Sequence, residues 1–354
     1  MNPTPLVRRR SLSGSLGLGE KLFASADERR FADAIERGLE QVEQGLAEQF
    51  GYADDLADTT SRYLFEAGGK RIRPTLALLT AQLGQGTTDD VLTGAKAVEI
   101  THLASLYHDD VMDDADLRRG VPSAQTVWGN TVAILTGDLL FARAASLVAE
   151  LGPETVKLQA QTFERLCLGQ LHETIGPRDD EDAVTHYIQV LADKTGSLIA
   201  AAAEIGVLHS GAPQEFRPAV TEFGERIGVA FQLIDDIIDL SAETGQTGKN
   251  AGTDLRAGVP TLPLIHLRRE AQTDAASADL LARIEQSAAD ESDAGGAAFA
   301  AAIAELRDHA VTAQTRAEAQ RWADDAVAAL APLPEGPVKK ALTKFAEAVV
   351  TRSN

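Results

Sequence analysis

The sequence predicts an all-α protein, and three features of the chain support that prediction. Apolar residues recur at spacings of three and four, the pattern of an amphipathic helix, first in the run Phe31, Ile35, Leu39 and Val42. Clusters of glycine and proline separate the periodic segments, as they do at helix ends. No segment of the sequence alternates between apolar and polar residues for long enough to indicate a strand.

The elements follow from these signals in chain order. Residues 1–25 are expected to be a flexible tail, because prolines, an arginine run and a Ser/Gly stretch bury too little apolar surface to become ordered. A single domain is expected over residues 26–354, beginning with a helix capped by Asp27. Its helices are separated by breaks at residues 68–69, 84–88, 120–122, 176–177, 211–213, 245–258 and 333–337. A loop is expected at 290–296, before alanine-rich helices between 297 and 329.

Charge and cysteine content exclude several classes of function. The formal net charge is −20, from 33 Lys and Arg against 53 Asp and Glu, and it repels nucleic acid. An anionic ligand must therefore be held by a local basic cluster or by metal ions. The single cysteine, Cys167, excludes an internal disulfide and a multi-cysteine zinc site, and it favours a cytoplasmic location. No apolar run approaches the roughly 20 residues of a membrane span, so no transmembrane segment is expected.

Two copies of the motif DDxxD are the strongest functional signal. The first, at residues 109–113, contains Asp109, Asp110 and Asp113, and the second, at 235–239, contains Asp235, Asp236 and Asp239. Residues four apart lie on one face of a helix, so each motif presents a pair of carboxylates in one direction. Mg²⁺ prefers oxygen ligands and is often shared between a few carboxylates and substrate phosphates. Two such motifs are therefore expected to hold a diphosphate through metal ions.

Two other interpretations of these motifs remain open. A single DDxxD in so acidic a chain is most simply a solvated face. Both motifs, however, lie in apolar helix sequence, where unpaired carboxylates would be costly to bury. The pair His108-Asp109 also resembles the HD pair of metal hydrolases, which would need further ligands such as His102 and His172.

Basic residues that could hold phosphate occur in several short segments. Residues 68–74 read GGKRIRP, in which glycines allow close backbone approach and arginine offers a bidentate fork. Arg118 and Arg119 follow the first acidic motif, and Lys194 and Thr195 precede a glycine. Lys249 lies in a glycine-rich segment. Each cation alone is more often a surface charge, and their combination with two carboxylate motifs favours a diphosphate site.

Taken together, these segments resemble the trans-isoprenyl diphosphate synthase (polyprenyl synthetase) family. Its marks occur here in family order: GGKRIRP, DDVMDDADLRRG, KTG, FQLIDDIID and GKNAGTDLRAGVPTLP. The resemblance covers residues 32–352 and is weakest after residue 264. It implies an isoprenoid synthase-type helical bundle with a deep central cavity, usually a homodimer, acting on isopentenyl diphosphate and an allylic diphosphate with several Mg²⁺ ions.

Roles follow from this resemblance position by position. The isopentenyl diphosphate pocket would comprise Lys70, Arg73, His102 and Arg119. The allylic diphosphate would contact Arg118, Lys194, Thr195, Gln232 and Lys249. The magnesium ligands would be Asp109, Asp113, Asp235 and Asp239, with Asp110 and Asp236 in support. One departure is Val259, where many members of the family carry a lysine.

The mechanism implied is a head-to-tail condensation. Cations and metal ions neutralise the allylic diphosphate as it leaves, and the double bond of isopentenyl diphosphate attacks the resulting allylic cation. A terpene cyclase or a head-to-head synthase would lack GGKRIRP. From another class, the chain could be a non-catalytic partner subunit of a heteromeric synthase, but such a subunit would have lost the aspartates.

Product length is predicted from the helix that carries the first motif. Ser105, Thr101 and Ala97 lie at four-residue steps from Asp109, with Ala104 beside them, and all are small. A short-chain member of the family typically carries a bulky aromatic at this depth, so the sequence predicts a long product of about six to ten isoprene units. A short-chain geranylgeranyl or farnesyl product is the alternative. Small residues that merely allow close helix packing would equally explain the pattern.

Overall fold

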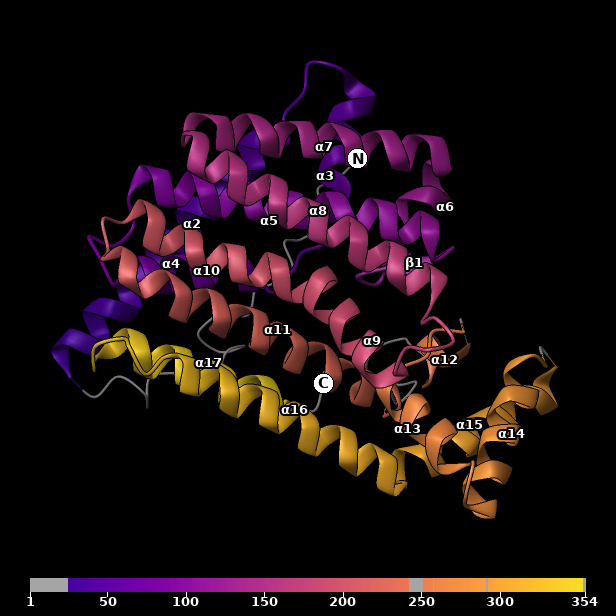
Figure 1. Ribbon diagram of the computed structural model, residues 1–354. Helices are drawn as coiled ribbons and strands as arrows, with labels where there is room; N and C mark the ends of the chain where they lie inside the picture. Colours follow the sequence, from indigo (N-terminus) through magenta and orange to yellow (C-terminus); the bar gives the residue numbers. More distant parts are fainter. Residues whose placement is uncertain (1–24, 242–250, 257, 291, 353–354) are drawn as a thin grey trace.

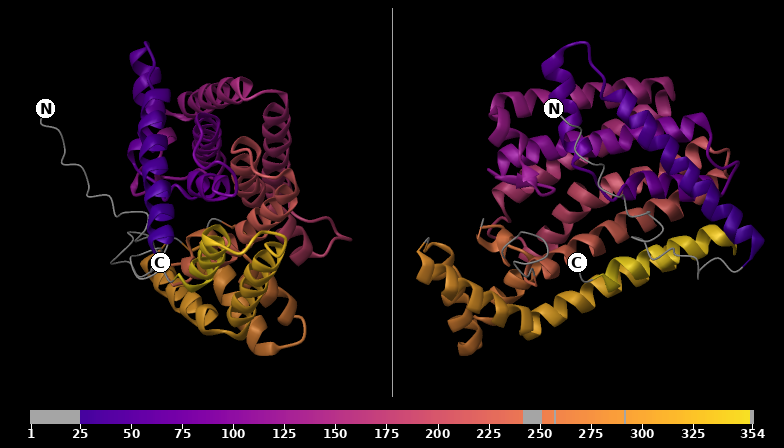
Figure 2. Two further views of the ribbon diagram at one scale, coloured as in Figure 1. Left: turned by 90° about the vertical axis from the view of Figure 1, so that its left-hand side faces the viewer. Right: turned by 180° about the vertical axis from the view of Figure 1, so that it is seen from behind.

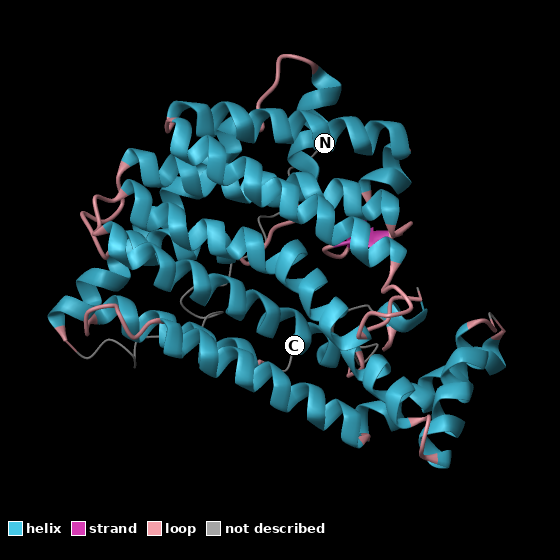
Figure 3. Ribbon diagram, viewed as in Figure 1, coloured by secondary structure: helices cyan, strands magenta, loops and turns pink. Residues whose placement is uncertain are grey.

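The structure, a computed structural model, describes residues 25–241, 251–256, 258–290 and 292–352. This part of the chain is helical almost throughout, with a single short strand pair (Figure 3). Residues 1–24 of the expected tail (residues 1–25) and Lys249 lie outside the described residues, whereas Ser25 is described.

The helices follow one another with short connections (Figure 1). The first half contains α2 (Ala26–Gln49), α3 (Asp55–Glu66), α4 (Ile72–Ala81), α5 (Asp89–Met112), β1 (Leu117–Arg118), β2 (Val121–Pro122), α6 (Ala124–Trp128), α7 (Asn130–Glu150), α8 (Pro153–Ile175) and α9 (Ala183–Leu191). The second half contains η2 (Ala192–Gly196), α10 (Ser197–His209), η3 (Gln214–Phe216), α11 (Arg217–Asp239), α12 (Thr253–Arg256), α13 (Leu262–Glu270), α14 (Ala275–Ala288), α15 (Asp293–Asp308), α16 (Ala310–Ala329) and α17 (Pro337–Thr351).

Two boundaries differ from those expected. The N-cap of α2 is Ser25 rather than Asp27: Ser25 accepts from the Glu28 amide, and Glu28 accepts in return, which satisfies two otherwise unpaired amides. Asp27 lies in the first turn instead. Helix α15 begins at Asp293, inside the expected loop, because Ser292 caps it by accepting from the Gly295 amide.

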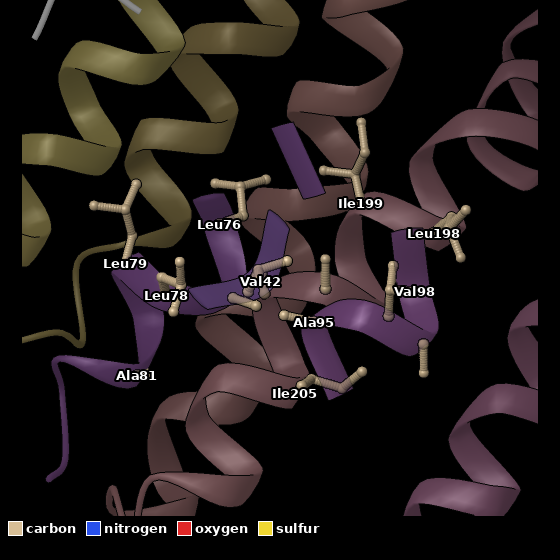
Figure 4. Close-up of a cluster of buried hydrophobic side chains, with 14 of the residues drawn as sticks. Val42, Leu76, Leu78, Leu79, Ala81, Ala95, Val98, Leu198, Ile199 and Ile205 are labelled. Atoms are coloured by element: carbon tan, nitrogen blue, oxygen red, sulfur yellow. The ribbon is translucent and has the colours of Figure 1, made fainter. Parts of the chain in front are cut away.

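Helix α10 forms the centre of the largest core. Nearly all of its side chains are buried, which is typical of a helix surrounded by others. It packs on α4, α5 and α11, and α2 covers α4 and α5 from the far side (Figure 2). Leu198, Ile199 and Ile205 of α10 meet side chains of α2, α4 and α5 there (Figure 4). Burial of such side chains stabilises the fold by roughly 1.5–3 kcal/mol each.

The two acidic motifs lie at the C-terminal ends of α5 and α11. Helix α5 ends at Met112 with Asp113 as its C-cap, and α11 ends at Asp239. The strand pair that follows α5 and the short helix α12 that follows α11 lie at the same end of the bundle (Figure 1). The fold therefore brings the two motifs to one end, although they are far apart in the sequence.

Helix α7 is the element closest to a membrane span. By length and composition alone, its 21 residues, with a mean hydropathy of 1.7, could cross a membrane. A single helix of this kind is weak evidence of a span, so the expectation of no transmembrane segment is not contradicted and stays a prediction. Core helices of helical bundles pass the same test, and α7 packs along α5.

Candidate active site

The first acidic motif contains one buried and two more accessible carboxylates. Asp110 is fully buried and pairs with Arg118 of β1, whose Nε lies 2.5 Å from Oδ1. Its other carboxylate oxygen is buried without a hydrogen-bond partner. Asp109 is half-buried, and Asp113, one turn later, is exposed; the Asp113 amide donates to the Asp109 carbonyl at 2.8 Å. Burial and the neighbouring Asp113 raise the pKa of Asp109 to about 6, against the lowering effect of Lys194.

The second acidic motif has the same division of roles. Asp236 is buried and accepts hydrogen bonds from the Tyr187 hydroxyl at 2.8 Å and from the Leu262 amide at 3.3 Å. Burial raises the pKa of Asp236 to about 8, although both hydrogen bonds act in the opposite direction. Asp239 accepts from the Asp254 amide at 3.3 Å. The middle aspartate thus anchors α11 to α9 and α13, whereas Asp235 and Asp239 share the outer face of the last helical turn.

Lys194 and Glu173 connect the two motifs. The Lys194 ammonium, from η2, donates to the carboxylate of Glu173 near the end of α8. Burial opposes its charge, but Asp109 and Glu173 outweigh burial and raise the pKa of Lys194. Glu173 also lines one pocket with Tyr187, the residue that donates to Asp236. The first motif, Lys194, Glu173 and the second motif therefore belong to one electrostatic group.

A cationic cluster borders the first motif. Burial, followed by the nearby cations Arg73, Arg119 and Arg118, holds the pKa of His102 well below its usual range, so this imidazole is neutral near pH 7. Burial also lowers the pKa of both Arg73 and Arg119 to about 10, which leaves them charged. The Nε of Arg73 is buried without a hydrogen-bond partner. A guanidinium whose Nε lacks a partner, beside a second arginine, is a site that a phosphate group would stabilise.

The remaining cations of the GGKRIRP segment have different environments. Arg71, with a positive φ of 51°, turns its side chain inward, where it pairs with Glu43 at 2.8 Å and Glu99 at 3.1 Å. It therefore has a structural partnership of its own. Lys70 is exposed. Within this segment Arg73, in the first turn of α4, is the cation that lowers the pKa of His102 most, and Arg71 lowers it less.

Other predicted residues are not brought into direct contact with these groups. Among the described residues, no hydrogen bond or ion pair joins Lys70, Thr195 or Gln232 to the aspartates. Thr195 and Gln232 are half-buried. Their roles stay predictions.

The residues predicted to set product length are all buried. Ala97, Thr101 and Ala104 have no exposed surface, and Ser105 is 7% exposed. Thr101 accepts from Gln159 of α8 at 2.7 Å, so it contributes to packing between helices. Successive residues of a helix turn by about 100°, which places Ser105 about 40° and Ala104 about 140° from Asp109 around α5. The role in chain length and the deep cavity stay predictions, with Ser105 nearest to the metal-site face.

Three site residues were not anticipated from the sequence: Glu173, Tyr187 and Arg352. Arg352 follows α17, and its Nη2 lies 2.8 Å from Asp235 Oδ1. Its guanidinium stacks 3.6 Å from the centre of the Phe231 ring. No local sequence signal distinguishes these residues, because their importance depends on which helices meet.

Comparison with known proteins identifies the family. The profile described as polyprenyl synthetase matches residues 54–300, more than half of the chain. The chain belongs to the polyprenyl synthetase family. It is 42% identical over 323 residues to the nonaprenyl diphosphate synthase of Mycobacterium tuberculosis, covering 91% of this chain and 94% of that protein.

Solved structures of this polyprenyl synthetase family have the same fold. A polyprenyl synthase from Caulobacter crescentus, in complex with calcium and isoprenyl diphosphate, superposes with a TM-score of 0.82 at 30% identity, covering 92% of this chain and 98% of that one. A geranylgeranyl pyrophosphate synthase from Corynebacterium glutamicum, with the same ligands, gives 0.77 at 38% identity, covering 94% and 99%. The expected all-α isoprenoid synthase fold and prenyltransferase activity of this polyprenyl synthetase are confirmed.

The donor set suits a divalent cation. Asp109 and Asp113 repel each other, and one carboxylate oxygen of Asp110 has no hydrogen-bond partner. A cation at the end of α5 would offset the repulsion and could also be contacted by that oxygen. Among the described residues, no three His, Cys, Asp or Glu side chains converge closely enough to form a ready-made metal site. That arrangement fits ions shared between a carboxylate pair and a phosphate rather than an all-protein cage.

Proposed function

We propose that this chain adds isopentenyl diphosphate units head to tail to an allylic diphosphate, with Mg²⁺, and releases a long all-trans polyprenyl diphosphate. The observation that carries the proposal is the ion pair between Lys194 and Glu173. Asp109 also attracts Lys194, and Glu173 lines one pocket with Tyr187, the donor to Asp236, so these groups lie between the two motifs. One substrate diphosphate could therefore be held by both motifs. The cytoplasmic location expected from the sequence belongs to this proposal.

The two substrates are assigned to separate basic groups. The arginine cluster beside His102 would hold isopentenyl diphosphate, because the Arg73 Nε lacks a partner and both arginines are charged. Lys194 would hold the allylic diphosphate, because it faces the carboxylates of the first motif. Such an arrangement places the two reacting carbons next to each other and lowers the entropic cost of their reaction.

Asp109, Asp113, Asp235 and Asp239 would hold the metal ions, and Asp110 and Asp236 would fix the helix ends that carry them. A bound divalent cation supplies positive charge against the leaving diphosphate. Mg²⁺ is favoured over Ca²⁺, the cation in the two solved relatives, because it is commonly shared between one or two carboxylates and substrate phosphates. Lys194 adds a fixed positive charge at the same place. The neutral His102 and the half-buried Arg73 and Arg119 would orient the second diphosphate.

A long product is proposed over a short one. The small residues along α5 and the similarity to a nonaprenyl diphosphate synthase support it. The similarity to a geranylgeranyl pyrophosphate synthase keeps the four-unit product as the second candidate.

A homodimer is part of the same proposal. Large apolar side chains on α6, α7 and α8 are exposed: Val127, Ile134, Leu135, Val156, Leu168, Leu171 and Ile175. Neighbouring helices α7 and α8 thus share an unpartnered apolar surface that a second copy of the chain would cover. Sedimentation should give a dimer, and Leu135→Arg, which charges a residue that is 60% exposed, should shift it toward monomer. A monomeric unmodified protein would contradict this assignment.

The function is tested by product analysis. Purified protein is incubated with Mg²⁺, labelled isopentenyl diphosphate and allylic primers of two, three and four units, and the dephosphorylated products are sized. Extension well beyond four units supports the proposal. Accumulation of three- or four-unit products supports the short-chain alternative, and no incorporation with any primer would favour a non-catalytic subunit.

A further inference from the structure

The segment that carries Lys194 is a π-helix rather than an α-helix. In η2 the Ser197 amide donates to the Ala192 carbonyl, five residues earlier, between the regular helices α9 and α10. A π-helical turn is rare and is frequently found at functional sites. Something must hold this turn in place, because an α-helical continuation would rotate Lys194 away from Asp109.

Arg165 of α8 holds this turn from one side. Its Nε lies 2.6 Å from Asp193 Oδ1, the residue immediately before Lys194, and its Nη1 pairs with Glu225 of α11. The second oxygen of Asp193 accepts from Gln189 at 2.8 Å. Asp193 is only 8% exposed, so both of these interactions are largely shielded from solvent. Arg165 thus joins α8, η2 and α11 through one guanidinium.

Two glycines allow the neighbouring helices to approach the same turn. A Cβ on Gly169 of α8 would lie 2.8 Å from the Lys194 amide nitrogen. A Cβ on Gly228 of α11 would lie 2.6 Å from the Gly196 Cα. The backbone of η2 is therefore enclosed between α8 and α11 immediately beside the arginine link.

We propose that Arg165 is a positioning residue for the reaction: it fixes the π-helical turn so that Lys194 remains beside Asp109, and it acts on substrate only through Lys194. The inference rests on the proposed function, since it takes the assignment of Lys194 to the allylic diphosphate as given. Loss of a residue that orients a ligand-binding group typically costs about 10- to 100-fold.

Arg217 provides a matched control. This arginine of α11 also joins two carboxylates on neighbouring helices, Glu154 of α8 and Glu204 of α10. Glu204 lies eight residues beyond the end of η2, about 12 Å along the helix axis. Arg217→Gln and Arg165→Gln therefore each remove one positive charge and two ion pairs between helices. Only Arg165→Gln removes an ion pair to η2.

The test combines kinetics with amide hydrogen exchange. In Arg165→Gln the KM for the allylic primer should rise about tenfold, with the KM for isopentenyl diphosphate changed less than about twofold. Arg165→Lys, which keeps the charge but loses the fork, should give an intermediate value. Amides of η2 should exchange faster in Arg165→Gln than in Arg217→Gln. Unchanged exchange in η2, or equal effects of Arg165→Gln and Arg217→Gln on the primer, would overturn the inference.

A double variant separates this inference from the proposed function. If Arg165 acts only through Lys194, Arg165→Gln combined with Lys194→Ala should bind primer no worse than Lys194→Ala alone. Additive losses would show that Arg165 acts independently and would overturn the positioning role. If Lys194→Ala itself leaves the primer KM unchanged, the assignment of Lys194 in the proposed function fails instead.

Discussion

The guanidinium of Arg352 lies 2.8 Å from the carboxylate of Asp235. A residue at the C-terminal end of α17 therefore places a positive charge beside the second acidic motif. Two further contacts hold it there: it stacks on the Phe231 ring and donates to the Phe231 carbonyl at 2.5 Å. Arg352 therefore forms an ion pair with Asp235, one of the carboxylates that we assign to metal binding. An arginine at this position competes with a divalent cation for Asp235.

Removing this competitor should tighten metal binding. We expect Arg352→Gln to lower the apparent Kd for Mn²⁺ by up to about fivefold, since a partly exposed ion pair contributes up to about 1 kcal/mol. Loss of the free Mn²⁺ signal in electron paramagnetic resonance measures binding directly, without turnover. Lys340→Gln, which alters a residue of α17 paired with Glu28 at 3.2 Å, changes the net charge equally. Weaker binding in Arg352→Gln, or equal effects of the two variants, would contradict the competition.

The two basic groups should separate kinetically. Arg73→Ala is expected to raise the KM for isopentenyl diphosphate more than that for the primer, because Arg73 belongs to the cluster around His102. Lys194→Ala should do the reverse, because Lys194 faces Asp109. Steady-state kinetics with each substrate varied in turn measures both constants. Parallel changes in both constants for both variants would show that the assignment is wrong.

The hydroxyl of Tyr187 should stabilise the end of α11. Tyr187→Phe removes the donor to the buried Asp236, and we expect the free energy of unfolding to fall by about 1–3 kcal/mol, the range for a buried acceptor that loses its donor. Tyr63→Phe, which removes a 2.8 Å hydrogen bond to the Pro122 carbonyl nearer the surface, should cost about 1 kcal/mol or less. Urea unfolding measures both. Equal losses would mean that Asp236 does not depend on Tyr187.

Product length should respond to bulk on the face of α5 nearest to the metal site. Ser105→Phe is expected to stay active and to release products of about three or four units, because Ser105 lies about 6 Å along the axis from Asp109. Ala104→Phe, the variant suggested by the sequence, should shorten products too, but at a cost of about 1–3 kcal/mol in stability, because Ala104 is fully buried. Chromatography of the dephosphorylated products and thermal melting measure the two effects. Long products from both active variants would contradict the proposed path of the chain.

Much of the fold and the identity of the aspartates were predictable from the sequence. Helical periodicity and glycine breaks act locally, and the spacing in DDxxD fixes the shared face of Asp235 and Asp239 without any tertiary information. The cap of α2 was misplaced by two residues because Ser25 and Asp27 are both good caps, and only Ser25 forms the reciprocal pair with Glu28.

The partners of the site residues were not predictable, since they depend on which helices meet. Nothing near Glu173 distinguishes it from the other acidic residues until α8 is placed beside η2. The same holds for Arg352, which reaches Asp235 only because α17 packs along α11. The π-helical turn of η2 was also missed, because its surroundings, the close approach of α8 and α11, leave no local pattern in the sequence.

Whether both acidic motifs act in one metal-dependent condensation is measured by the turnover rate of Asp109→Asn and Asp235→Asn. Each variant removes one carboxylate charge, and a contact that stabilises the developing charge contributes roughly 3–4 kcal/mol, so each should be slower by at least a few hundredfold. The exposed Asp180→Asn serves as the control and should match the unmodified protein. Near-normal turnover in either site variant, or full activity of the unmodified protein in excess EDTA, would contradict the account.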